Sequence, residues 1–418
     1  MASKFDLSSN PIQRMRDIQH FGEEGGVVPV IDVAATSTFL DPLDMVKTFQ
    51  GELEGCYLYS RHSNPSVSAF GKKLAAMEGM EEAIGLASGM AAITCAVLQV
   101  APKGSHIVAS RTVYGGTFAF FQNILPRWGI EVTFVDSSDP EAFKKAIQKN
   151  TCAFYTETLS NPLLNFCDIH SISKIAKKNN LSLIVDNTFT PLIYSPAKWG
   201  ADIVVYSCTK YISGSSDLTA GAVVGSSEFI KKLKDVNTGM AMLLGPVMDP
   251  RVAHELYLRL DHLGVRMKAH SQSAQFFAEE LKKENIPVIY PGLPTNPQYD
   301  LFSSQKNDFG YGGMLTIDCK TPEKVLLLAS KLQKINFGLY AVSLGFSRSL
   351  LCCPALSTSS EIPEEDRNEM GLSPGLLRIS LGYVGDDQIM TERFLSCYQQ
   401  IMFENQNEKF SNPLEASL

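Results

Sequence analysis

The sequence predicts an α/β protein, with a large and mostly parallel sheet domain followed by a smaller C-terminal α+β domain. Between residues 81 and 225, short runs of β-forming residues alternate with amphipathic helical stretches. The strand-like runs are almost continuously apolar, which is typical of parallel strands that helices cover on both faces. Residues 251–285 then show helical periodicity without an internal proline, so we expect a long helix, or a broken pair of helices, before a second domain.

The individual elements follow from the length and composition of each segment. Short apolar runs predict strands at residues 81–88, 105–110, 131–136, 151–158, 181–188, 203–207 and 221–225. Longer periodic runs predict helices at residues 89–101, 116–128, 139–148 and 168–180. The second domain has β-rich runs at residues 312–319, 339–345 and 376–383, and helical stretches at residues 322–335 and 386–404.

These patterns divide the chain into three parts. Residues 1–60 lack the regular alternation and are expected to form an arm that contacts a partner subunit. Residues 61–255 hold the large sheet, and residues 256–418 form the C-terminal domain. The polar segment 405–418 is expected to be frayed.

The composition limits the kinds of partner that the protein can bind. At 418 residues, with 44% hydrophobic and 19% charged residues, the chain has the composition of a globular protein with a sizeable core. A net charge of −7 provides no basic surface for nucleic acid or an anionic membrane, so we expect a small-molecule partner. The sequence has no apolar signal core, no membrane-spanning run and no CxxC pair among nine cysteines. We therefore expect a reduced, soluble, cytoplasmic protein without a metal site.

Lys210 is the first candidate for a chemical role. It lies three positions after the end of the strand-like run 203–207, and the hydroxyl residues Ser207 and Thr209 precede it. A surface lysine is the ordinary alternative, but apolar and hydroxyl neighbours on both sides make solvation of the ammonium group unfavourable. Because Schiff-base chemistry needs an amine that can lose its proton, Lys210 is predicted to carry pyridoxal phosphate.

Two further features fit this cofactor. Asp186 ends a buried strand, where a carboxylate needs a cationic partner such as a protonated pyridine nitrogen, although it could instead cap the next turn. Ser88, Gly89 and Met90 begin a helix after a strand, and the free N–H groups of such a helix start favour a phosphate. The helix start is a weak signal alone, since glycine-containing turns are common between strands and helices.

These three elements, in this order, resemble the cysteine and methionine metabolism family of fold-type I pyridoxal phosphate enzymes. The family includes cystathionine γ-synthase, cystathionine lyases, methionine γ-lyase and homoserine sulfhydrylases. The similarity covers roughly residues 25–400, and the segment from Asp202 to Gly214 matches the family's lysine signature, with Ser215 where His or Gln is usual. The resemblance implies the fold-type I transferase fold, with residues 61–255 as the pyridoxal phosphate-binding domain, and a homotetramer built as a dimer of dimers.

The resemblance also assigns cofactor-binding residues. The phosphate would be held by Ser88, Gly89, Met90, Ser207 and Thr209. In the segment YSRHSNPS, Tyr59 and Arg61 would reach the phosphate of the neighbouring subunit's cofactor, so active sites would form only in a dimer. Without that motif, the two residues would be interpreted as a surface pair.

Other residues match groups that contact the cofactor ring or the substrate. Tyr114 would stack on the pyridine ring and act as an acid or base toward the leaving group. Glu157 and Asn161 would lie on the cofactor side, with Asn161 near the ring hydroxyl. Ser343 and Arg378 would hold the substrate carboxylate, a task that suits the guanidinium fork. A structural ion pair is the other interpretation of Arg378.

The substrate pocket gives conflicting signals. Val342 offers an apolar wall that suits a thioether, and it is similar to methionine γ-lyase, as is the segment TFAFF. However, Gly116 stands where methionine γ-lyases usually have Cys, and Gly-Gly-Thr is commoner in cystathionine lyases and sulfhydrylases. Arg348 and Ser359 also depart from the usual Glu and His, so the chain is a divergent member.

The predicted reaction is α,γ-elimination, with α,β-elimination as a related activity. L-Methionine or homocysteine would give 2-oxobutanoate, ammonia and a thiol, with Lys210 and Tyr114 as the catalytic residues. The alternatives are a cystathionine γ-lyase, or γ-replacement as in cystathionine γ-synthase or O-acetylhomoserine sulfhydrylase. A catalytically silent binding module and an aminotransferase are more distant alternatives. The intact set of Lys210, Asp186, Tyr114 and Arg378 argues against the silent module.

Overall fold

The computed structural model describes residues 7–18, 26–50, 52–53, 55–360 and 362–403. The segment 405–418, which we expected to be frayed, lies outside the described residues. None of the described helices is both long enough and apolar enough to cross a membrane.

A seven-stranded sheet forms the centre of the larger part of the molecule. All seven strands expected from the sequence are present: β1 (Glu82–Leu86), β2 (His106–Ser110), β3 (Glu131–Val135), β4 (Thr151–Glu157), β5 (Ser182–Asp186), β6 (Ile203–Ser207) and β7 (Gly221–Gly225). The strands lie in the order β1-β7-β6-β5-β4-β2-β3. Only β7 runs antiparallel to its neighbours, so the expected mostly parallel α/β fold is confirmed.

Helices cover both faces of this sheet because successive strand residues point to opposite sides. In β5, Leu183 and Val185 join one apolar core, whereas Ile184 joins the other. The helices between or beside the strands are α3 (Pro65–Glu78), α4 (Gly89–Val100), α6 (Pro140–Lys145), α7 (Ile169–Lys178), α8 (Ser227–Leu233) and α9 (Met240–Leu244). The expected helix 116–128 is divided into α5 (Gly115–Ala119), a π-helical turn (Phe120–Ile124) and a 3₁₀ turn (Leu125–Trp128) that contains Pro126.

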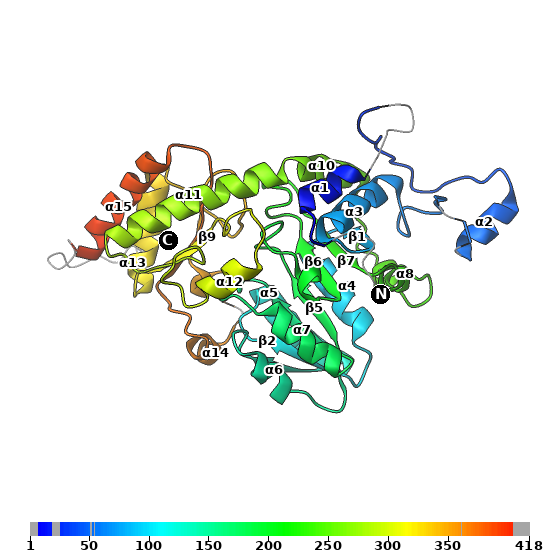
Figure 1. Cartoon of the computed structure of the whole chain (residues 1–418), viewed down its shortest axis with the longest axis horizontal. Coiled ribbons are helices and arrows are strands. Elements are labelled where there is room, and N and C mark those ends of the chain that lie inside the picture. Colours follow the sequence, from blue (N-terminus) through cyan, green and yellow to red (C-terminus); the bar gives the residue numbers. More distant parts are fainter. Residues whose placement is uncertain (1–6, 19–25, 51, 54, 361, 404–418) are drawn as a thin grey trace, which may run out of the picture.

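Two consecutive helices connect the large sheet to a second sheet. The helical region predicted at 251–285 is a broken pair, α10 (Pro250–Asp261) and α11 (Leu263–Lys283), which meet at His262. Figure 1 shows α11 running from the large sheet toward the C-terminal helices. Because α11 spans both parts, its side chains can contact loops from either sheet.

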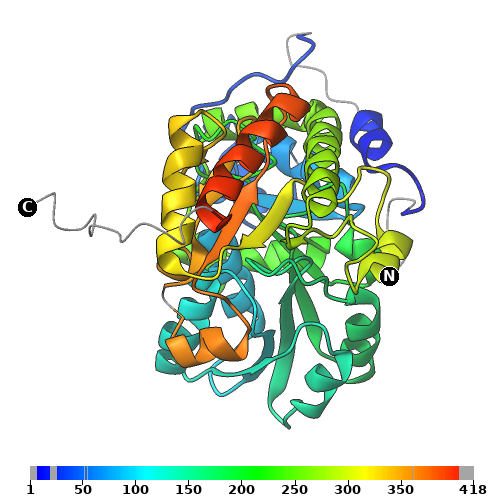
Figure 2. The same cartoon turned by 90° about the vertical axis from the view of Figure 1, so that its left-hand side faces the viewer.

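The second sheet has five strands in the order β10-β11-β12-β9-β8. The strands are β8 (Val288–Ile289), β9 (Met314–Asp318), β10 (Leu339–Tyr340), β11 (Leu350–Cys352) and β12 (Leu376–Ser380). Helices α13 (Pro322–Lys334) and α15 (Asp387–Phe403) pack beside α11 over this sheet (Figure 2), while α12 (Tyr299–Gln305) and α14 (Glu364–Glu369) lie in its connections. This arrangement confirms the expected α+β pattern.

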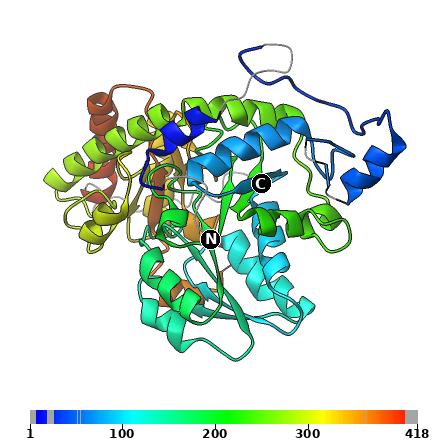
Figure 3. The same ribbon diagram turned by 45° about the vertical axis from the view of Figure 1, so that its right-hand side comes forward.

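The described residues of the N-terminal region include two short helices with different surroundings. Helix α1 (Pro11–Asp17) packs on α3, whereas α2 (Pro42–Phe49) projects away from the rest of the molecule (Figure 3). The projecting segment exposes Leu40, Leu43, Met45, Val46 and Phe49. Such a concentration of exposed apolar side chains is typical of a surface that another polypeptide covers.

Candidate active site

A cavity of about 260 Å³ lies where the carboxyl ends of β4, β5 and β6 face the loop after β10. Parallel strands place their C-terminal ends at one edge, which is where α/β proteins commonly bind ligands. The residues that line the cavity are Ser88, Gly89, Met90, Ile93, Tyr114, Glu157, Leu159, Asn161, Asp186, Thr188, Phe189, Ser207, Thr209, Lys210, Thr219, Val342, Leu344, Thr358 and Arg378. Twelve of the site residues predicted from the sequence are in this list.

Lys210 reaches into the cavity from the turn after β6. Its Nζ donates a hydrogen bond of 3.0 Å to Ser343 Oγ, which brings the predicted Ser343 into the site. Burial, together with the nearby Arg378 cation, lowers the pKa of the Lys210 amine from 10.5 to about 8, and burial is the larger cause. The amine can therefore both accept and release a proton near neutral pH.

This lowered pKa predicts a pH-dependent cost of burying Lys210 in the cofactor-free protein. The unfolded chain keeps the ordinary pKa of 10.5 and so binds more protons between about pH 8 and 10.5. The cost is fully present below pH 8 and is lost as the pH rises through that window. We expect Lys210→Met to increase the free energy of unfolding by ~1–3 kcal/mol at pH 7, and by much less at pH 10.

Urea unfolding of the cofactor-free protein at the two pH values measures this difference. Lys178→Met, which replaces an exposed lysine at the end of α7, is the matched control. An equal gain at both pH values would contradict the predicted titration of Lys210.

Two buried carboxylates lie side by side at the ends of β4 and β5. Glu157 and Asp186 are partners in the strand register. Burial raises the pKa of Asp186 to about 6, although its Oδ1 accepts a hydrogen bond of 2.9 Å from the Thr188 N–H. Burial and the neighbouring Asp186 raise the pKa of Glu157. Among the described residues, no lysine, arginine or histidine forms an ion pair with either carboxylate, so the site suits a cationic ring nitrogen.

The start of α4 forms a cradle that fits a phosphate. Ser88 caps the helix, and its Oγ accepts a hydrogen bond of 3.1 Å from the Ala91 N–H. A Cβ atom on Gly89 would lie 2.6 Å from the Cβ of Ser207, so only glycine fits without a shift. Thr209 is fixed by hydrogen bonds to Ala220 of 2.9 and 3.2 Å. Backbone amides and hydroxyls thus converge at a helix N-terminus, which favours an anion.

This close approach predicts that Gly89→Ala weakens cofactor binding. Because the added methyl group would push Ser207 away from α4, we expect the affinity for pyridoxal phosphate to fall by about tenfold to a hundredfold. An absorbance titration of the cofactor-free protein measures the change. Thr94→Ala on the same helix, outside the cavity, should bind with parental affinity, and parental affinity in Gly89→Ala would refute the cradle.

Arg378 supplies a cationic group on the other side of the cavity. It is 2% exposed on β12, and its Nη1 donates to Asn161 Oδ1 at 2.8 Å. A second contact of 3.5 Å reaches the Ser343 carbonyl. No carboxylate pairs with Arg378 among the described residues, which argues against the structural ion pair and leaves the guanidinium fork available for an acidic ligand group.

Gly345 allows the loop that carries Val342 and Ser343 to lie against the backbone at Lys210. Its φ of +79° lies in the left-handed region, and an added Cβ would lie 2.7 Å from the Tyr211 nitrogen. The same Cβ would lie 3.0 Å from the Lys210 carbonyl carbon. The loop that carries Val342 and Ser343 therefore packs directly on the peptide bond that follows Lys210.

Tyr114 lies at the mouth of the cavity and is 40% exposed. Its backbone N–H donates a 2.7 Å hydrogen bond to Glu157 Oε1. Gly116 does not line the cavity, but an added Cβ there would lie 2.6 Å from Tyr114 Cε1 and 3.3 Å from Met90 Sδ. The absence of a side chain at Gly116 thus lets the Tyr114 ring lie close to the backbone.

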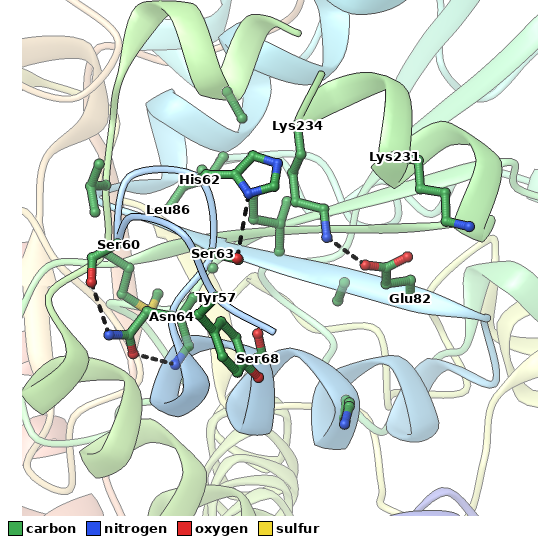
Figure 4. A pocket seen from close by; sticks show the side chains of 18 of the residues that line it. Tyr57, Ser60, His62, Ser63, Asn64, Ser68, Glu82, Leu86, Lys231 and Lys234 are labelled. Atoms are coloured by element: carbon green, nitrogen blue, oxygen red, sulfur yellow. Dashed lines mark hydrogen bonds and ion pairs between the residues drawn. The ribbon is translucent and has the colours of Figure 1, made fainter. Parts of the chain in front are cut away.

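Tyr59 and Arg61 are not part of this cavity. Tyr59 is 48% exposed, and the Arg61 guanidinium lies 5.7 Å from its ring while donating 3.1 Å to the Met242 carbonyl. Arg61 lines a separate pocket of about 840 Å³ (Figure 4), where Lys234 pairs with Glu82 at 2.7 Å. Within one chain, neither residue lines the Lys210 cavity.

Sequence reasoning missed several residues that line the cavity. Thr188 could have been found, because it follows Asp186 at the same strand end, and its hydroxyl accepts from the Ser207 N–H at 2.8 Å. Ile93, Leu159, Phe189, Thr219, Leu344 and Thr358 belong to helical or irregular segments without such a signal. The three departures Ser215, Arg348 and Ser359 do not line the cavity.

Pyridoxal phosphate uses a lysine of lowered pKa, a carboxylate for its ring nitrogen and an anion cradle together, and the residues present fit it. The fold and the cavity therefore define a pyridoxal phosphate-dependent enzyme. Residues 14–392 match the family model described as Cys/Met metabolism PLP-dependent enzyme, and the chain belongs to this family.

Relatives support the same conclusion. The chain is 45% identical to "Methionine gamma-lyase" of Arabidopsis thaliana, over 90% of this chain and 87% of the relative. It is 39% identical to "Cystathionine gamma-lyase" of Bacillus subtilis, over 84% of this chain and 92% of the relative. A solved structure of a putative O-acetylhomoserine (thiol)-lyase from Campylobacter jejuni, which contains N'-pyridoxyl-lysine-5'-monophosphate, is similar with a TM-score of 0.86. Its identity is 29%, and the match covers 94% of this chain and 100% of that one.

Proposed function

We propose that the protein is a lyase that uses water to convert L-methionine to 2-oxobutanoate, ammonia and methanethiol, or homocysteine to 2-oxobutanoate, ammonia and hydrogen sulfide. The observation that carries this proposal is the distribution of charge in the cavity. Its only charged lining residues among those described are Glu157, Asp186, Lys210 and Arg378. These four can serve the cofactor and one amino-acid head group, and no further charged group remains for a second one. The methionine γ-lyase relatives agree with this choice.

The substrate's γ substituent then meets an apolar wall. Leu159, Phe189, Val342 and Leu344 line the cavity together with the hydroxyl of Thr358. A thioether or thiol is accommodated by such a wall, whereas a second ammonium and carboxylate would lack partners there. The wall therefore favours methionine and homocysteine over cystathionine.

The roles of the residues follow from their positions. When bound, pyridoxal phosphate supplies an electron sink that stabilises negative charge next to the substrate's amino group. Asp186 holds a proton on the ring nitrogen, and Arg378 with Ser343 orients the substrate carboxylate. Lys210 removes the α proton, since its lowered pKa makes the neutral amine accessible near neutral pH. Tyr114, at the mouth of the cavity, donates a proton to the departing thiolate.

γ-Replacement is the second candidate. The relatives include "O-succinylhomoserine sulfhydrylase" of Pseudomonas aeruginosa, at 33% identity over 89% of this chain and 90% of the relative. An incoming thiol would use the same lysine, tyrosine and arginine. A cystathionine γ-lyase activity would need the distal head group to stay in solvent at the cavity mouth.

One set of assays separates these activities. The holoenzyme is supplied with methionine, homocysteine, cystathionine, cysteine or O-acetylhomoserine, with and without added thiol, and 2-oxobutanoate and ammonia are measured. We expect 2-oxobutanoate from methionine without added thiol. Product that forms only from an activated homoserine plus thiol would refute the lyase proposal and support γ-replacement.

We further propose that the chain forms a dimer of dimers in which residues 1–60 contact a partner subunit. The exposed apolar side chains around α2 and the distance of Tyr59 and Arg61 from the chain's own cavity support this assembly. In a dimer, Tyr59 and Arg61 would complete the neighbouring phosphate site. All nine cysteines are free, which suits a reducing compartment such as the cytoplasm. Sedimentation of the wild-type protein, and of Phe49→Asp, tests the assembly.

A further inference from the structure

Arg266, on the first turn of α11, lies behind the loop that carries Lys210. Its guanidinium donates to two successive carbonyls of that loop, those of Tyr211 and of Ile212, the second at 2.9 Å. Two further N–H groups donate to the Arg259 carbonyl at 3.1 Å and to His262 Nδ1 at 2.9 Å. One side chain therefore ties the residues after Lys210 to the junction of α10 and α11.

The loop is shaped to receive this guanidinium. Gly214 has a φ of +72°, and a Cβ atom at that position would overlap Nη1 of Arg266. Gly214 N–H in turn donates to the Lys210 carbonyl at 2.8 Å. The turn from Lys210 to Gly214 thus closes around the arginine, and its geometry depends on the position of the guanidinium plane.

The charge of Arg266 has no acidic partner among the described residues. The side chain is 7% exposed, and burial lowers its pKa to about 10. Burying an unpaired cation is unfavourable, so Arg266 would be a poor choice for filling space alone. Arg378, rather than Arg266, is the cation that lowers the pKa of Lys210. Any effect of Arg266 on Lys210 is therefore exerted through geometry.

One turn further along α11, His270 makes the corresponding contact with the other side of the site. Burial lowers its pKa to about 4, so the ring is neutral, and Nδ1 donates to the Leu381 carbonyl at 2.7 Å. Leu381 directly follows β12, the strand that carries Arg378. The His270 ring also lies 5.1 Å from that of Tyr211. Helix α11 thus contacts both the lysine loop and the end of the arginine strand.

We propose that Arg266 is a positioning residue that fixes Lys210 in the cavity by holding the two carbonyls that follow it. This inference rests on the proposed role of Lys210 as the cofactor lysine. Arg266 does not line the cavity that would hold the cofactor and the substrate. Its effect is to keep the Lys210 loop ordered on α11, at a fixed position relative to the strand of Arg378.

The test compares Arg266→Met and Arg266→Lys with the parent and with the control Arg251→Met, an exposed arginine on α10. Hydrogen exchange of residues 208–216 is measured in the cofactor-free proteins, and the release rate of pyridoxal phosphate is measured in the loaded ones. In Arg266→Met we expect both rates to rise by about tenfold or more, because two loop carbonyls lose a charged donor. Arg266→Lys should restore part of the effect, since an ammonium group can still donate to one carbonyl.

Two results would overturn the proposal. One is parental exchange in 208–216 and parental cofactor release in Arg266→Met. The other is accelerated exchange throughout the protein without excess in this loop, which would show that Arg266 only contributes to overall stability. The exchange measurement needs neither cofactor nor substrate. It therefore still tests whether Arg266 holds the Lys210 loop if the lyase assays fail.

Discussion

Replacing Lys210 with alanine is expected to reduce the rate of 2-oxobutanoate formation by about 10³-fold or more. Two functions would be lost together, because we propose that the amine both attaches the cofactor and exchanges the α proton. The visible absorption band of the lysine-bound cofactor should disappear in the same variant. Absorbance spectra and the assay with methionine measure the two effects.

Lys178→Ala serves as the control, since this exposed lysine at the end of α7 lies outside the cavity. It should retain the parental spectrum and rate. A Lys210→Ala protein with an undiminished visible band and full turnover would rule out the central assignment of the site.

Replacing Arg378 with methionine is expected to lower kcat/KM for methionine by about 10²–10³-fold. The guanidinium is buried beside Asn161 and Ser343, so without it the substrate carboxylate would be desolvated with no cationic partner. The amine 3-(methylthio)propylamine, which lacks the carboxylate, is a second probe. Parent protein should bind methionine far better than this amine, and the variant should lose that preference.

A second effect of Arg378→Met should appear at Lys210. Because the arginine cation lowers the pKa of this amine, its removal should raise the pKa, while burial keeps it below 10.5. The pH dependence of kcat should shift to higher pH accordingly. Arg348→Met, an exposed arginine near the same loop, is the control. An unchanged preference for the carboxylate in Arg378→Met would show that another residue binds this group.

The parts of the site that the sequence predicts are those attached to regular elements. Lys210 and Asp186 each follow an apolar strand, and Ser88 begins a helix with clear periodicity, so the rule that strand ends meet at one edge places them together. Arg378 could be predicted because a lone arginine interrupts an otherwise apolar strand.

The remaining features of the site depend on tertiary contacts that leave no periodic pattern in the sequence. Thr358 lies in an irregular connection after β11, and Gly345 reaches the Lys210 peptide through a loop rather than a strand. Arg266 binds the carbonyls of Tyr211 and Ile212, which lie 55 and 54 positions before it in the chain. These contacts can be recognised only when the position of α11 against the large sheet is known. The segment 116–128 was predicted as one helix, whereas Pro126 and the π-helical turn divide it.

The contact between Gly345 and the peptide of Lys210 restricts how this enzyme can acquire new substrates. The backbone of the loop after β10 cannot move inward without displacing the lysine. Evolution of specificity for bulkier or more polar amino-acid substrates therefore has to proceed through changes of side chains. The candidate positions are Val342, which is 65% exposed, and Thr358. Selection experiments that randomise these two positions should yield altered specificity with the cofactor still bound, whereas insertions in the loop should yield inactive proteins.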